Sequence, residues 1–95
     1  MTRPERPDIA VRAVGGRRFE VTTSAGVHMV TADDDVLGAL GWTDPSTADL
    51  ERLVAGSFRF LLAREPAGSI LTRFDLSVIE TYFPGYLRDI RAGFG

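Results

Sequence analysis

The chain has 95 residues, of which 44% are hydrophobic and 25% charged, as expected for one small globular domain. Its formal net charge of −2 provides no overall attraction to nucleic acid or to an anionic membrane. Cysteine is absent, which excludes disulfides, thiolate metal sites and thiol catalysis. Lysine, asparagine and glutamine are absent as well, so every basic side chain other than the single histidine is an arginine.

The N-terminal stretch MTRPERP is polar and rich in proline, and it predicts a flexible tail over residues 1–7. It lacks the apolar segment of a secretion signal, and no apolar run in the chain approaches the length of a membrane span. We therefore expect a cytoplasmic protein with no membrane partner. One α+β domain is expected over residues 8–92, followed by a short tail over 93–95.

Three short runs, DIAVRAV, RFEVTTS and VHMVT, are rich in β-branched and apolar residues, and glycines separate them. This pattern predicts a three-stranded antiparallel β-meander. In the first hairpin, an odd-length loop pairs Val11 with Val21 and Ala13 with Phe19. That register keeps the apolar residues on one face, whereas a two-residue Gly-Gly loop would exchange the two faces.

The second hairpin contains the sequence SAG, which predicts a three-residue loop with Gly26 in the left-handed conformation. This loop pairs Thr23 with Val27. His28 then lies on the solvent-facing side of the sheet, near Glu20. A surface histidine in that position could be replaced by alanine with little effect on stability or function.

The stretch DPSTADLERLVAGSFRFLLAREP contains the strongest helix signal in the chain, after a short helix expected in TADDDVLGALGW. Ser46 and Asp49 have the spacing of a capping box, and Pro66 marks the end. The apolar residues of this helix cover an arc of about 200°, which is wider than contact with one sheet requires. A further element must therefore cover the second side of the helix.

That element is expected in FDLSVIETYFPGYLRDI, residues 74–90. We predict that Asp75 caps a helix beginning at Leu76, with Phe74 packed on Ile79 as a hydrophobic staple, and that the Pro-Gly pair breaks it. One face of this segment closes the core. The side chains that point away from that face form the candidate interface with another chain: Val78, Tyr82 and Tyr86.

Few residues in the chain could carry out catalysis. His28 is the only histidine, and no nucleophile-elbow pattern accompanies it. The aspartates of DDD, residues 33–35, lack the spacing of a calcium-binding loop, and the GGRR stretch lacks the glycine spacing of a nucleotide-binding loop. We therefore expect no cofactor, no bound metal and no evident small-molecule ligand, and we lean towards a non-enzymatic protein.

Arg12, Arg17 and Arg18 form a candidate anion-binding patch on the predicted sheet. A nucleic-acid reader usually carries a broader basic surface, so a nucleic-acid partner is disfavoured. The predicted meander followed by a helix resembles small antitoxin-like folds and regulatory modules, a likeness of fold that assigns no function.

The predicted fold is α+β: a three-stranded antiparallel β-meander, a long central helix on one face, and a C-terminal helical segment covering that helix. The predicted function is a small protein-interaction or regulatory module that self-associates through its C-terminal aromatic segment. Two alternatives stay open. One is a nucleic-acid-binding or antitoxin-like regulator that uses the sheet arginines, and the other is an accessory subunit of a larger complex.

Overall fold

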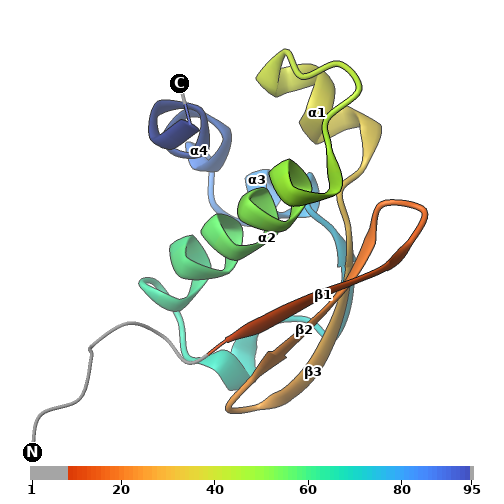
Figure 1. Ribbon diagram of the computed structural model, residues 1–95. Helices are drawn as coiled ribbons and strands as arrows, with labels where there is room; N and C mark the ends of the chain where they lie inside the picture. The colour runs from red at the N-terminus through yellow and green to blue at the C-terminus, as the bar shows by residue number, and fades with distance from the viewer. Residues whose placement is uncertain (1–8, 95) are drawn as a thin grey trace, which may run out of the picture.

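The computed structural model describes residues 9–94, so the tail predicted over residues 1–7 lies outside the described part of the chain (Figure 1). The elements follow in the order β1 (Ala10–Gly15), β2 (Arg18–Thr23), β3 (Gly26–Thr31), α1 (Asp34–Leu40), α2 (Thr47–Leu62), the 3₁₀ turn η1 (Ala67–Ser69), β4 (Arg73–Asp75), α3 (Val78–Tyr82) and α4 (Tyr86–Phe94). Residues 93 and 94, which we assigned to a C-terminal tail, belong to α4.

The predicted α+β class is confirmed. The sheet has the strand order β1-β2-β3-β4, with β1 to β3 antiparallel and β4 parallel to β3. Helices α1 to α4 lie on one side of the sheet, and no helix of residues 9–94 covers the other face (Figure 1). The protein therefore has an inner sheet face against the helices and an outer sheet face towards solvent.

The first hairpin has the predicted register, with Val11 opposite Val21 and Ala13 opposite Phe19. Gly16 and Arg17 both have positive φ angles, of 62° and 64°, which is the pattern of the type I′ turns that favour tight hairpins. A β-bulge between Ala13 and Gly15 takes up the remaining residue. This combination keeps Phe19 and Val21 buried on the inner face.

The second hairpin differs from the prediction by one residue. Thr23 pairs with Gly26 across a two-residue turn, where we expected Val27 opposite Thr23. The Thr23 hydroxyl accepts a hydrogen bond of 3.1 Å from the Ala25 N–H, which stabilises the shorter turn. Because side chains alternate along a strand, the shift moves His28 to the inner face and leaves Val27 51% exposed.

His28 is consequently a buried residue, with an exposed fraction of 2%, and the predicted solvent-facing position is wrong. Its Nδ1 lies 2.8 Å from the Leu71 carbonyl oxygen, and since a carbonyl can only accept, Nδ1 carries the proton. Its Nε2 lies 2.9 Å from the Thr23 hydroxyl, which donates to it. The ring also meets Phe58 edge-on, with centroids 5.4 Å apart. Every polar atom of the imidazole thus has a partner.

We predict that His28→Ala lowers the free energy of unfolding by about 2–4 kcal/mol, because it removes two buried hydrogen bonds and leaves a cavity beside Phe58. Denaturant unfolding followed by circular dichroism measures the change. Val27→Ala, one position earlier on the exposed side of β3, should change it by less than about 0.5 kcal/mol. Equal effects of the two substitutions would contradict the observed register.

β4 was not predicted. Phe74 and Asp75, expected before and at the start of a helix, lie in this strand, and α3 begins only at Val78. The Asp75 side chain is exposed and does not cap the helix. The Met29 N–H donates to the Thr72 carbonyl at 2.7 Å at one end of the pairing. A three-residue strand that pairs with a distant segment leaves no periodicity by which the sequence could reveal it.

Helix α2 begins as predicted. The Ser46 hydroxyl accepts from the Asp49 N–H at 3.1 Å, and the Asp49 carboxylate accepts from the Ser46 N–H at 3.3 Å, which completes the capping box. The helix ends at Leu62, before Pro66. One side of α2 contacts the sheet, where Phe58 lies 6.0 Å from Phe74 between ring centroids.

The other side of α2 contacts α4, so the C-terminal segment covers the helix as predicted. Tyr86 at the start of α4 is fully buried, and its hydroxyl lies 2.6 Å from the Ser57 hydroxyl. Because Ser57 donates its own proton to the Leu53 carbonyl, the Tyr86 hydroxyl is the donor in this pair. Burial raises the pKa of Tyr86, so its proton stays available for this hydrogen bond.

Replacing Tyr86 tests this packing. We expect Tyr86→Phe to lower the free energy of unfolding by about 1–2 kcal/mol, since the buried Ser57 oxygen loses its donor. Tyr86→Ala should lower it by about 3–5 kcal/mol, because the whole ring is removed from the core. Thermal or denaturant unfolding measures both. An unchanged stability for Tyr86→Ala would contradict its place between α2 and α4.

Candidate functional site: an apolar groove beside β4

An open groove of about 370 Å³ lies where the end of α2, the following loop, β4 and α3 meet. We call it the α3–β4 groove. Its volume is at the lower end of the range of ligand pockets, and its walls are mostly aliphatic and aromatic, as in most binding sites. Ten residues line it: Leu61, Glu65, Ser69, Ile70, Leu71, Phe74, Val78, Ile79, Tyr82 and Phe83.

The rim of this groove exposes large apolar side chains. Leu71 is 48% exposed and Tyr82 is 66% exposed. The only other exposed large apolar side chains among residues 9–93 are Val14 and Val27, which do not line the groove. Large apolar side chains that gather around a hollow indicate a contact surface more strongly than scattered ones do.

The groove has few polar side chains, and they are not joined to one another in the described structure. Glu65, Ser69 and Tyr82 supply a carboxylate and two hydroxyls, but no hydrogen bond joins their side chains in the described structure. A nucleophile needs a base within hydrogen-bonding reach. His28 cannot serve as this base, because its two ring nitrogens already bond to Thr23 and to the Leu71 carbonyl.

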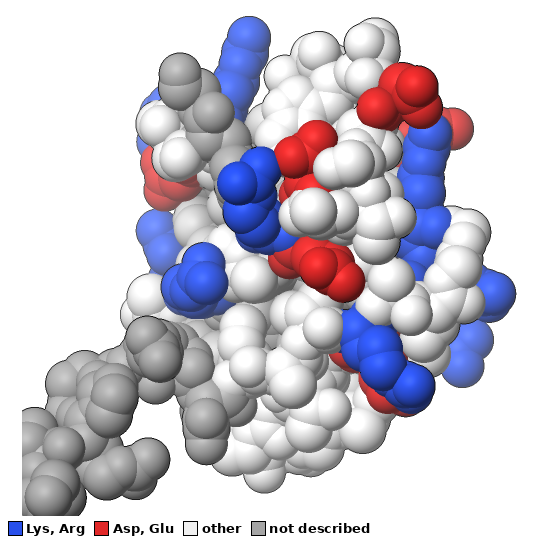
Figure 2. All heavy atoms as spheres, in the orientation of Figure 1, with Lys and Arg blue, Asp and Glu red and all other residues white. Residues whose placement is uncertain are grey.

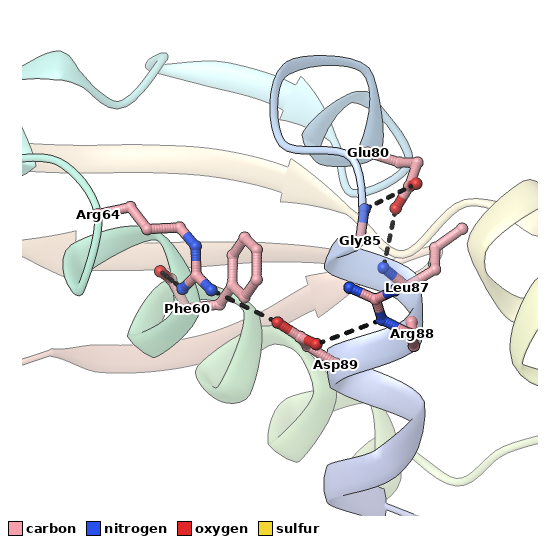
Figure 3. Close-up of polar contacts among 7 residues, drawn as sticks. All are labelled: Phe60, Arg64, Glu80, Gly85, Leu87, Arg88 and Asp89. Carbon is pink, nitrogen blue, oxygen red and sulfur yellow. Dashed lines mark hydrogen bonds and ion pairs between the residues drawn. The ribbon is translucent and has the colours of Figure 1, made fainter.

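Glu80 holds α3, which forms one wall of the groove, against the start of α4 (Figure 3). Its carboxylate accepts hydrogen bonds from the Leu87 N–H at 2.9 Å and from the Gly85 N–H at 3.1 Å. The first N–H groups of a helix have no acceptor within the helix, and these two are at the start of α4. Gly85 has a φ of 105°, a conformation that allows the sharp turn between the two helices.

The far side of α4 is tied to α2 in the same view (Figure 3). The Arg64 guanidinium stacks over the Phe60 ring at 3.6 Å from its centroid, and it reaches the Asp89 carboxylate at 3.4 Å. Phe60 in turn lies 5.2 Å from Tyr86 between ring centroids. Ring stacking and an ion pair thus hold α4 against α2.

The hydrogen bonds from Leu87 and Gly85 lower the pKa of the Glu80 carboxyl below its ordinary value of 4.5. A lowered carboxyl pKa stabilises the fold above the ordinary pKa, and that contribution is lost as the pH falls through the folded-state pKa. We therefore predict that Glu80→Gln lowers the melting temperature at neutral pH, and that the difference from wild type shrinks towards acid pH.

Glu51→Gln is the matched control for Glu80→Gln, because Glu51 forms no side-chain hydrogen bond within the described structure. Its difference from wild type at neutral pH should be small, since no side-chain hydrogen bond is lost. Melting curves at a series of pH values measure both variants. A difference for Glu80→Gln that stayed constant into acid would show that its carboxylate does not cap α4.

The structure separates the three residues of the candidate interface. Tyr82 lies on the exposed rim of the groove, and Val78 is half-buried in its wall. Tyr86 is different, because it is fully buried and bonded to Ser57, so its assignment to a surface was wrong. Sequence reasoning missed Leu71, which lies on the rim without belonging to any helix or strand.

The three arginines of the candidate anion patch are exposed, but two of them have carboxylate partners. Arg12 forms an ion pair with Glu20 at 2.7 Å, and Arg17 pairs with Asp34. Arg18 reaches only the Gly15 carbonyl, at 3.5 Å. On the face shown in Figure 2, acidic and basic side chains are interleaved and much of the surface is uncharged. This arrangement leaves little unbalanced positive charge for a polyanion.

The three consecutive aspartates serve separate purposes. Asp33 is at the N-cap position of α1, but its carboxylate accepts from the Ser77 N–H at 3.0 Å and so ties α1 to the start of α3. Asp34 pairs with Arg17, and Asp35 is exposed. Within residues 9–94 no three histidine or acidic side chains converge as a metal site would require. No helix in that range could span a bilayer.

The chain matches no protein-family model, no curated protein and no solved structure.

Proposed function

We propose that the protein is a small non-enzymatic interaction module that self-associates through the α3–β4 groove. The observation that supports this most directly is the exposure of Leu71 and Tyr82 on the rim of a hollow whose floor is apolar. Water contacts this surface in the isolated chain, and covering it with a second protein surface is favourable in proportion to the apolar area removed from water.

The composition of the groove favours a protein surface over a reacting substrate. Aromatic residues are enriched in protein interfaces, and tyrosine contributes both contact area and a hydroxyl that can form hydrogen bonds. Tyr82 has these properties, and it lines the groove together with the apolar side chains of Val78 and Phe83. Catalysis would require convergent polar groups, which the groove lacks.

We predict that Tyr82→Glu shifts the protein from dimer to monomer while the fold persists, because a charge would then have to be desolvated at the apolar contact. Sedimentation velocity over a range of concentrations measures the association, and circular dichroism checks the fold. Tyr82 is exposed in the single chain, so the substitution should leave thermal stability at low concentration nearly unchanged.

Thr81→Glu is the matched control for Tyr82→Glu. Thr81 is the preceding residue of α3, is exposed and does not line the groove, so the same added charge falls outside the proposed contact. This variant should associate as the wild type does. A wild type that stays monomeric at every concentration would overturn the proposed self-association.

A further inference from the structure

β4 leaves one edge of the sheet open beside the groove. It is the last strand in the sheet order, and within the described residues only β3 pairs with it. The Thr72 carbonyl accepts from Met29 and the Leu76 N–H donates to Thr31, so these groups point towards β3. Since backbone groups alternate along a strand, the N–H and C=O groups of Arg73 and Asp75 point to the open edge.

The sequence of β4, Arg-Phe-Asp, is complementary to itself when two copies run antiparallel. With Phe74 at the centre of the pairing, Arg73 of each copy lies opposite Asp75 of the other. Their side chains share the outer sheet face, because Arg73 pairs with Met29 and Asp75 with Thr31 in β3. Neither Arg73 nor Asp75 forms an ion pair within the described chain.

The inner face of the same pairing uses the groove. Phe74 lies opposite Val30 in β3, points to the inner face and lines the groove. A second copy of β4 at the open edge would place its own Phe74 on the same inner face, next to the first copy's Phe74. The exposed residues Leu71 and Tyr82 line the same groove as Phe74.

We propose that a second copy of this chain is the occupant of the groove, and that the two copies join by antiparallel pairing of their β4 strands into one continuous eight-stranded sheet. This proposal rests on the proposed self-association and specifies its geometry. The two-fold axis passes between the two Phe74 residues. The N–H and C=O groups of Arg73 and Asp75 then form four hydrogen bonds across the interface, as hydrogen-bonded antiparallel pairs do.

A charge exchange at β4 tests this geometry. In a dimer of Arg73→Asp, both cross-strand pairs consist of two acidic residues. In a dimer of Asp75→Arg, both consist of two basic residues. Each single variant should therefore raise the dimer dissociation constant about ten-fold. An equal mixture of the two single variants should associate as tightly as the wild type, because every pair in the mixed dimer is again of opposite charge.

In the variant that carries both substitutions, each copy again presents one acidic and one basic residue to the other copy, so it should also dimerise like the wild type. Sedimentation equilibrium measures all four samples, and circular dichroism confirms their folds. Amide hydrogen exchange gives a second readout. The Arg73 and Asp75 amides should become protected only at concentrations where the dimer forms, whereas the Phe74 amide, which faces β3, should be protected in the monomer as well.

The outcomes separate this proposal from the proposed function. In one outcome, Tyr82→Glu dissociates the wild-type dimer, but both single charge changes are tolerated and the Arg73 and Asp75 amides stay unprotected. That result keeps the self-association and overturns the strand pairing. A mixture of the single variants that associates no better than either alone also overturns the pairing. A monomeric wild type overturns both proposals.

Discussion

The attachment of residues 71–76 to β3 determines where every feature of the candidate site lies. The His28 imidazole donates to the Leu71 carbonyl at one end of this segment, and the Leu76 N–H donates to Thr31 at the other, over 2.9 Å. Between them, Phe74 enters the core beside Phe58. The segment therefore extends the sheet by one strand, presents Leu71 at the groove and leaves the second edge of β4 unpaired within the described residues.

The groove itself follows from the length of α2. This helix ends at Leu62, and the chain then turns away through η1 before it enters the sheet again at β4. Leu61 of α2, Glu65 after the helix end, and Val78, Ile79 and Tyr82 of α3 all line the groove. A domain of this size buries a smaller share of its surface than a larger protein does, so one region between two layers can stay partly uncovered. Here that region is lined mostly by apolar side chains, and the proposed self-association would cover it.

The buried polar groups form their hydrogen bonds within the fold. His28, Ser57 and Tyr86 each have their hydrogen-bonding groups paired inside the fold, and no buried side-chain polar atom in the described range lacks a partner. Groups whose hydrogen bonds are satisfied within the protein stabilise it and specify its packing, but they are not free to act on a substrate.

The sequence by itself determined the features that depend on neighbouring residues: the capping box of α2, the wide apolar arc that requires cover on two sides, and the first hairpin, whose register follows from keeping Phe19 and Val21 on one face.

Only the tertiary structure decided the rest. The position of His28 depends on one residue in a turn, and a shift of one exchanges the faces of a strand. β4 forms because β3, more than 40 residues earlier, supplies its hydrogen bonds. Tyr86 is buried because α4 packs against α2, where the Ser57 hydroxyl accepts a hydrogen bond from the Tyr86 hydroxyl. Val78 and Tyr82 could be selected from their helical spacing. The groove that they line also includes Leu71 and Phe74, which long-range backbone pairing brings beside α3. Local sequence patterns do not record such pairing.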